Sequence, residues 1–254
     1  MITASSAPIR IQDRMAVPAV EPLETGVEPL ETGKVNAKLV SLLRPNSLEA
    51  GRYHRLRHAV ERLAEENGKS VVIGITSPQS GDGKTLTSIN LAGALAQDPN
   101  ARVLLVELDI RQPRDNIKTY LGIRKLSAPG VTELIQDQTL SLHRAVRYIP
   151  SFNLHLLTSG KASENHYELL KSARLAALIQ EARERYHYVI LDTAPVVPVP
   201  DSQLLSPLVD GFMLLVAAGH TSERVLAEAL NLLEPDKVMG LVFNAAPVGD
   251  TQAY

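Results

Sequence analysis

The chain has 254 residues and is 44% hydrophobic, which suffices for one large α/β domain with a substantial core. Its formal net charge of −2 at pH 7 disfavours nucleic-acid binding, which usually requires a strongly basic surface. The absence of cysteine excludes disulfides and thiolate metal sites, and no apolar run approaches the ~20 residues of a membrane helix.

The N-terminal region is poor in large apolar residues and rich in proline. Residues 20–26 and 27–33 form a tandem repeat, VEPLETG. Such composition cannot bury enough surface to fold alone. We therefore predict a flexible tail over residues 1–35 and a folded domain over residues 36–254. Because the N-terminus lacks a signal-peptide pattern, we expect a cytoplasmic protein that contacts a membrane only peripherally, through a partner.

The domain is predicted to begin with helical segments. A short helix is expected within Val35–Leu43, and Asn46 or Ser47 is expected to cap a longer helix that ends near Asn67. The longer helix carries a basic face that includes Arg52 and Arg55. In isolation, that face is typical of a solvated helix surface.

The stretch SVVIGITSPQSGDGKTLTSINLA, residues 70–92, predicts a buried strand, a glycine-rich loop and a helix. Backbone N–H groups of such a loop and the helix N-terminus bind phosphate, Lys84 reaches the β and γ phosphates, and Thr85 binds Mg²⁺. Pro78 stands where the usual motif has its first glycine. The residues expected to bind the nucleotide here are Ser80, Gly81, Asp82, Gly83, Lys84, Thr85 and Leu86.

Two later strands end in acidic residues. The apolar run at 102–108 carries Glu107 and is followed by Asp109, and alternation places both side chains on one side of the strand. The run at 188–192 ends in Asp192. At the carboxyl edge of an open α/β sheet, these acids would face the nucleotide and its metal ion.

Strands alternate with helices along the whole domain. We predict an α/β P-loop NTPase with a mainly parallel central sheet and helices on both faces. The strands are expected at 71–76, 102–108, 152–158, 188–192, 211–217 and 239–244.

Three motifs together resemble the bacterial tyrosine kinases of capsule and exopolysaccharide assembly. SPQSGDGKT, VLLVELDIR and YVILDTAP are similar to the Walker A, Walker A′ and Walker B motifs of that family. NHYELLKS (165–172), DSQLLSPLVDGFMLLV (201–216) and GLVFN (240–244) extend the similarity over residues 36–247. The resemblance implies a protein-tyrosine autokinase that uses ATP and Mg²⁺ and regulates polysaccharide polymerisation and export.

The resemblance also implies roles for individual residues. Lys84 would polarise the transferred phosphate, and Thr85, Asp109 and Asp192 would arrange Mg²⁺. Glu107, where the family usually has aspartate, would help to activate the acceptor hydroxyl. Arg111 and Asn244 match family positions at the nucleotide, the latter beside the adenine. Glu49, Arg52 and Arg55 match a subunit contact of a homo-oligomeric ring, although a register centred on Tyr53, Leu56 and Arg57 also fits.

The chain departs from the family pattern in its C-terminal tail. The usual tyrosine cluster is missing, and Tyr254 alone remains as a possible phosphoacceptor. No membrane segment is fused to the kinase, as in the split family members that a separate membrane-embedded chain-length-determinant protein activates. That protein is the expected partner, and no nucleic acid is expected.

Other functions remain open at this point. The chain could be a non-kinase ATPase switch of the same polysaccharide pathway, as the missing tyrosines and Glu107 suggest. A partition or cell-division ATPase is disfavoured because their signature lysine is replaced by Gln79. A binding module with a dead site is disfavoured by the intact Lys84, Asp109 and Asp192.

Overall fold

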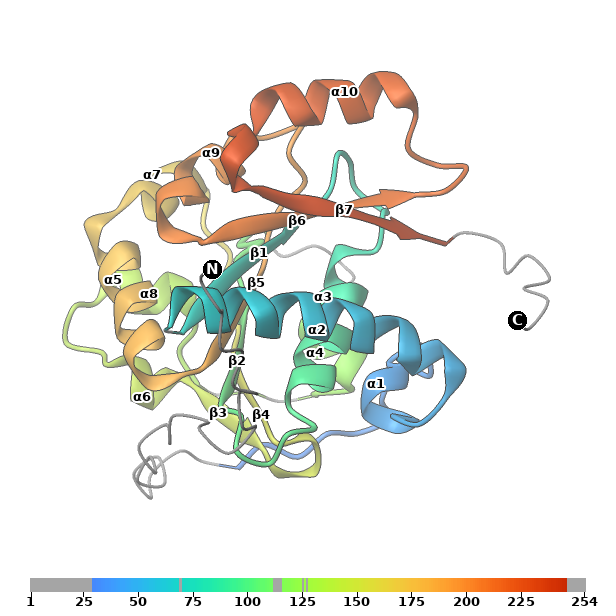
Figure 1. The fold of residues 1–254 in the computed structure, drawn as a ribbon. Coiled ribbons are helices and arrows are strands. Elements are labelled where there is room, and N and C mark those ends of the chain that lie inside the picture. The colour runs from blue at the N-terminus through green and yellow to red at the C-terminus, as the bar shows by residue number, and fades with distance from the viewer. Residues whose placement is uncertain (1–28, 69, 112–115, 125, 127, 246–254) are drawn as a thin grey trace, which may run out of the picture.

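The fold was established from a computed structural model that describes residues 29–68, 70–111, 116–124, 126 and 128–245. One sheet crosses these residues, with its seven strands in the order β3-β4-β2-β5-β1-β6-β7 (Figure 1). The strands are β1 (Val71–Thr76), β2 (Val103–Glu107), β3 (Arg147–Ile149), β4 (Leu154–Leu157), β5 (Tyr188–Asp192), β6 (Gly211–Ala217) and β7 (Val238–Asn244).

The prediction of a mainly parallel sheet is confirmed. Every neighbouring pair is parallel except β3 and β4, which are antiparallel. β3 was not among the predicted strands, because its three residues at the sheet edge carry no continuous apolar run. Since the other strands share one direction, their carboxyl ends meet at one edge of the sheet, and the register sets Glu107 beside Asp192 there.

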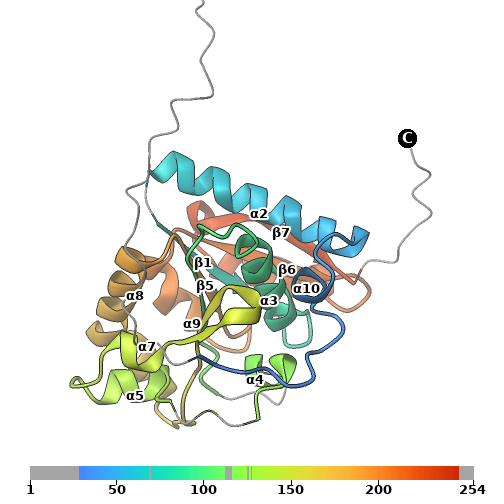
Figure 2. The same cartoon turned by 90° about the horizontal axis from the view of Figure 1, so that it is seen from below.

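One face of the sheet is covered by the first four helices of the described chain. They are α1 (Val40–Leu43), α2 (Leu48–Asn67), α3 (Lys84–Leu95) and α4 (Ile117–Leu121). Ser47 caps α2, as predicted, by accepting a hydrogen bond from the Ala50 N–H at 3.2 Å. α2 is the outermost helix on this face and lies against α3 (Figure 2).

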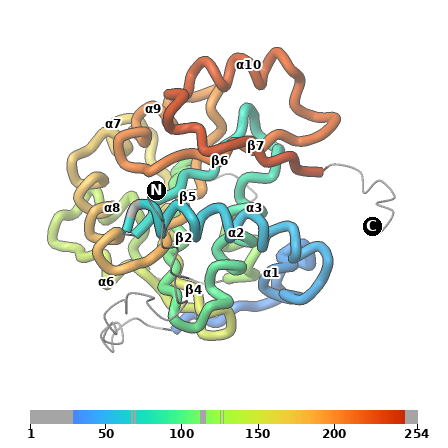
Figure 3. The backbone as a smooth tube through the Cα atoms, viewed as in Figure 1, coloured from blue at the N-terminus to red at the C-terminus, as the bar shows by residue number. Residues whose placement is uncertain are grey.

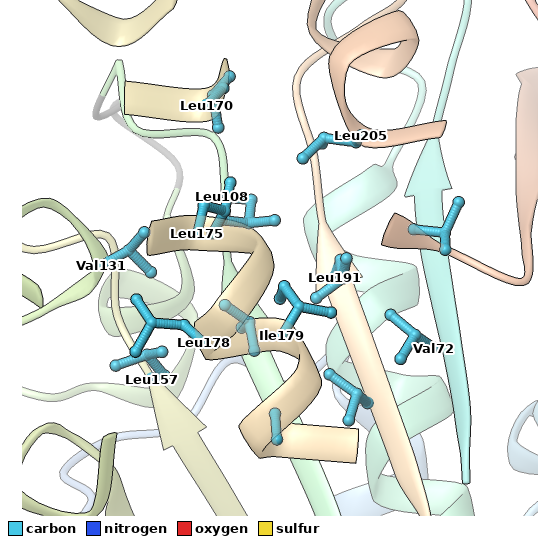
Figure 4. Close-up of a cluster of buried hydrophobic side chains, with 14 of the residues drawn as sticks. Val72, Leu108, Val131, Leu157, Leu170, Leu175, Leu178, Ile179, Leu191 and Leu205 are labelled. Carbon is cyan, nitrogen blue, oxygen red and sulfur yellow. The ribbon is translucent and has the colours of Figure 1, made fainter. Parts of the chain in front are cut away.

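The opposite face carries the remaining α-helices of the described chain. They are α5 (Val131–Gln136), α6 (Leu142–Ala145), α7 (His166–Lys171), α8 (Ala173–Arg185), α9 (Asp201–Leu205) and α10 (Glu223–Leu232). Short 3₁₀ turns lie at Pro150–Phe152, Ser206–Leu208 and Pro235–Lys237. Aliphatic side chains of α5 to α10 and of the strands form a continuous core on this face; those from Val72, Leu178 and Leu191 are among the ones drawn in Figure 4. Helices on both faces therefore confirm the predicted architecture.

The apolar spacing of residues 168–185 predicts one continuous helix, but the structure has two, α7 and α8. The chain breaks at Ser172, whose backbone is extended and whose hydroxyl accepts a hydrogen bond from the Leu175 N–H at 3.2 Å. A serine that caps α8 competes with continued helix, because its side chain replaces a backbone partner. The apolar spacing alone did not reveal this break.

The structure describes part of the predicted tail, residues 29–35, and the extent of the tail and of the folded domain stays a prediction. The described chain begins at residue 29, and the segment that leads into α1 already runs along the domain (Figure 3). The Leu30 N–H donates to the Tyr148 carbonyl of β3 at 2.8 Å, and the Asn36 N–H donates to the Tyr120 carbonyl at 2.8 Å. Residues 1–28, the rest of the predicted tail, lie outside the described residues. Within the part of the chain that is described, no helix has the length and apolarity to cross a membrane.

Candidate active site

The glycine-rich loop between β1 and α3 has the backbone shape that the sequence predicts. Gly81 and Gly83 have φ angles of +91° and +97°, which favour glycine. Gly83 is the N-cap of α3, so the first N–H groups of that helix point into the loop. A Cβ atom at Gly83 would lie 2.1 Å from Asn244 Nδ2, so a side chain here would displace the Asn244 amide from the loop. The loop is therefore shaped to present backbone donors to a phosphate.

Lys84, the first residue of α3, is almost fully buried. Burial lowers the pKa of its ammonium group, and the carboxylates of Asp192, Asp109 and Asp82 act in the opposite direction. Three acidic residues from separate segments therefore act electrostatically on one lysine. Removing the ammonium would leave these carboxylates without their shared cation.

Asp192, at the end of β5, lies beneath the first turn of α3 and is buried. Its Oδ1 accepts a hydrogen bond from Ser88 Oγ at 3.0 Å. Burial raises the pKa of this carboxyl to about 7, against hydrogen bonds from Thr85 and Ser88 and the charge of Lys84. A cation bound at this carboxylate would favour its ionised form.

Asp109 lies two residues beyond the end of β2. Its N–H donates to the Asp192 carbonyl at 3.1 Å, which fixes the two acidic segments side by side. Burial raises the pKa of Asp109, while the charges of Lys84 and Arg111 lower it. Its Oδ1 is buried and has no hydrogen-bond partner among the residues that the structure describes. A buried carboxylate oxygen that lacks a hydrogen-bond donor is suited to bind a hard cation such as Mg²⁺.

Glu107, predicted as a catalytic acid, is occupied by structural hydrogen bonds. One oxygen accepts from the Ile117 N–H at 3.0 Å, at the start of α4. The other accepts from the Ser159 N–H at 3.0 Å and from its hydroxyl at 2.8 Å. The carboxylate therefore links the ends of β2 and β4 to α4. Its activation of an acceptor hydroxyl stays a prediction.

Arg111 pairs with an acid that sequence reasoning did not single out. Its guanidinium forms a bidentate ion pair with Asp201, at the start of α9, with the longer contact at 2.9 Å. The Asp201 side chain is only 2% exposed, and its hydrogen bond with Arg111 raises the pKa of the guanidinium. Bidentate pairing fixes the guanidinium plane. The predicted nucleotide contact of Arg111 is not tested by this geometry.

The remaining predicted positions divide between the site, the core and the undescribed tail. Asn244 ends β7 and donates through Nδ2 to the Asp82 carbonyl at 2.9 Å, which places it against the glycine loop. The partly buried Leu86 side chain packs on the core, and its predicted contact with the nucleotide stays a prediction. Tyr254 lies outside the described residues, and its role as phosphoacceptor stays a prediction.

Several residues at the site were not predicted from the sequence motifs. Ser88 lies one helical turn beyond Lys84, a spacing that could have marked it. Asp201 stands within a stretch that resembles the kinase family, which was a usable signal. His220 and Thr221, which contact Asp82 across the sheet edge, carry no recognisable pattern.

Comparison with known proteins places this site in a family. A family model described as an AAA domain matches residues 70–206. Tyrosine-protein kinase YwqD of Bacillus subtilis (strain 168) is 30% identical over 224 residues, which covers 87% of this chain and 91% of YwqD. The solved BceF tyrosine kinase domain has 30% identity and a TM-score of 0.70, with 87% of this chain and 93% of that domain covered.

Some relatives are much longer than this chain. The succinoglycan biosynthesis transport protein ExoP of Rhizobium meliloti (strain 1021) is 29% identical over 220 residues. That match covers 83% of this chain but only 26% of ExoP. The matched region is therefore a kinase-like unit that also occurs within larger proteins. The chain belongs to the family of bacterial tyrosine-protein kinases, which is built on a P-loop AAA domain.

Proposed function

We propose that this protein is a Mg-ATP-dependent protein-tyrosine kinase that phosphorylates itself or a partner. The observation that carries the proposal is the arrangement of Lys84, Asp109 and Asp192 around the glycine loop. Each comes from a different segment, and the electrostatics of Lys84 couple it to both acids. Such a constellation supplies the charge neutralisation that phosphoryl transfer requires.

The residues of the chain divide the work of the reaction. Backbone N–H groups of residues 80–84 bind and orient the triphosphate. The Lys84 ammonium faces the phosphate that is transferred and stabilises the charge that develops on its oxygens. Ser88 holds the Asp192 carboxylate at 3.0 Å, which positions it below the first turn of α3. Asn244 stands beside the loop, where the adenine would lie.

The residues present fit Mg²⁺ in two respects. Asp109 Oδ1 is buried without a hydrogen-bond partner among the described residues, and a bound cation would offset the cost that burial imposes on the ionised form of Asp192. Thr85, Asp109 and Asp192 would hold the ion. When bound, it would neutralise charge on the phosphate oxygens.

The pathway and the partner belong to the proposal as well. The name of ExoP refers to succinoglycan biosynthesis and transport, and the sequence motifs resemble kinases of capsule and exopolysaccharide assembly. We therefore place this kinase in exopolysaccharide polymerisation and export. It would lie at the cytoplasmic face of the membrane through a membrane-embedded chain-length-determinant partner.

A homo-oligomeric ring is the proposed assembly. Glu49, Arg52 and Arg55 are exposed on α2, where the family resemblance implies a subunit contact. Replacing Arg52 and Arg55 with alanine should shift the protein toward monomers in sedimentation-velocity experiments. Unchanged sedimentation would argue against this surface.

The leading alternative is an ATPase switch of the same pathway, favoured by the structural hydrogen bonds of Glu107. Measuring ADP and phosphotyrosine in the same reaction separates the two functions. The kinase predicts that both form with the wild type and that Lys84→Met abolishes phosphotyrosine. ADP without phosphotyrosine on the protein or its partner would favour the switch.

A further inference from the structure

The acidic residue inside the glycine loop, Asp82, raises a physical problem. Its side chain is fully buried, yet it lies one residue from Gly81 and Gly83, where a triphosphate would bind. An unbalanced buried carboxylate at this place would repel the phosphates and would cost free energy on burial. The chain must therefore hold and screen this carboxylate by other groups.

The loop between β6 and α10 supplies those groups. Thr221 Oγ1 donates to Asp82 Oδ1 at 2.8 Å, and His220 Nδ1 lies 2.9 Å from the same oxygen. Gln79 Nε2 also lies 3.0 Å from His220 Nδ1. Because a carboxylate only accepts, we assign the proton of the His220–Asp82 contact to Nδ1. The second oxygen of Asp82 accepts from the Gln79 N–H at 3.2 Å, which braces the glycine loop from within.

The contacting loop is itself held in place. The Ala217 N–H donates to Thr221 Oγ1 at 3.1 Å, so the hydroxyl must direct its own proton to Asp82. The Ala218 N–H donates to the Asn244 carbonyl at 2.9 Å, which ties the loop to the end of β7. Between the two loops, Gln79 Nε2 of the glycine loop donates to the His220 carbonyl at 3.1 Å. These bonds order the donors before any ligand arrives.

We propose that His220 and Thr221 are positioning residues for nucleotide binding, which act through the Asp82 carboxylate to hold the glycine loop in its phosphate-binding shape. The inference rests on the proposed nucleotide site and adds residues from outside its three motifs. The proposal requires no contact between either residue and the nucleotide. Their effect is on the preorganisation of the loop, so both ATP and ADP should sense their loss.

The test is the affinity of the full chain for MgATP and MgADP, measured by isothermal titration calorimetry. His220→Ala should weaken both nucleotides about tenfold, the effect of losing one charge-assisted hydrogen bond. His220→Asn should restore affinity to within about threefold, because its amide N–H₂ can take the place of Nδ1–H. His58→Ala, at an exposed position of α2, serves as the matched control and should bind like the wild type.

The Thr221→Val and Thr221→Ser pair repeats the test without changing a histidine. Valine keeps the shape but removes the hydroxyl that donates to Asp82 and accepts from the Ala217 N–H, so it should weaken binding, whereas serine should keep both bonds and the affinity. Wild-type affinity in both His220→Ala and Thr221→Val would overturn the proposal. So would His220→Asn and Thr221→Ser variants that bind as weakly as His220→Ala and Thr221→Val.

The result also separates this inference from the proposed function. A wild type that binds MgATP but forms no phosphotyrosine would contradict the kinase and leave the positioning role testable by affinity. A wild type that binds neither nucleotide would contradict both. Circular dichroism and the melting temperature of each variant establish that a weak binder is folded.

Discussion

Replacing Glu107 with glutamine tests whether this acid supports the structure around the site. The carboxylate accepts three hydrogen bonds, from the N–H groups of Ile117 and Ser159 and from the Ser159 hydroxyl. An amide offers one acceptor oxygen, and its nitrogen would face a donor. If the oxygen stays with Ser159, the fully buried Ile117 is left with an unsatisfied N–H.

The magnitude follows from these contacts. An unsatisfied buried donor costs about 1–3 kcal/mol, and the two remaining bonds lose their charge-assisted character. We expect Glu107→Gln to lower the free energy of unfolding by about 3 kcal/mol. That is a large share of the ~5–15 kcal/mol by which natural domains are stable.

The assay is equilibrium unfolding in urea, with Glu133→Gln as the matched control. Glu133 also accepts from two backbone N–H groups, those of Gly130 and Lys161, but it is partly exposed. Water can replace its bonds, so about 1 kcal/mol should be lost there. An unfolding free energy of Glu107→Gln within about 0.5 kcal/mol of the wild type would refute the structural role. Combined with lost phosphoryl transfer, it would assign Glu107 to the chemistry.

Three further predictions concern other parts of the domain. Burial lowers the pKa of His155 to about 4, whereas a histidine in the unfolded chain titrates near 6.5. The neutral His155 side chain therefore contributes fully to stability above pH 6.5, and this contribution declines as the pH falls toward 4. From pH 7 to 5 the wild type should lose about 2 kcal/mol more unfolding free energy than His155→Gln. Equal losses would contradict this. Gly83→Ala should weaken MgATP binding more than tenfold, because alanine disfavours a φ of +97° and its Cβ would meet Asn244, and unchanged affinity would argue against the loop geometry. Asp201→Asn should lower the unfolding free energy by about 2 kcal/mol, because it leaves the Arg111 guanidinium without its partner, and no loss on urea unfolding would show that the ion pair is dispensable.

The features that were predicted well from the sequence depend on residues that are close together along the chain. β1 was predicted with its observed bounds because all six of its residues are buried and apolar or small. Gly83, Lys84 and the helix that follows were recognisable because a phosphate-binding loop needs those residue types in that order. Asp192 was found because an apolar strand that ends in an acid, about a hundred residues after such a loop, fits the second acid of P-loop enzymes.

The features that sequence missed depend on distant contacts. Arg111 and Asp201 are 90 positions apart, and Asp82 and His220 are 138 positions apart, so no periodicity connects them. Glu107 was predicted from its place at a strand end, but its partners come from α4 and from the segment after β4. Only the fold reveals that its oxygens are already engaged.

The central claim is that this site transfers a phosphoryl group from ATP to tyrosine. Its most direct test is mass spectrometry of the full chain after incubation with Mg-ATP, with and without the cytoplasmic segment of the proposed membrane partner. The Lys84→Met variant is the control. The account predicts phosphotyrosine, on Tyr254 or on the partner segment, that is absent from the control. ADP formation without phosphotyrosine on either protein, or equal phosphotyrosine in the control, would contradict it.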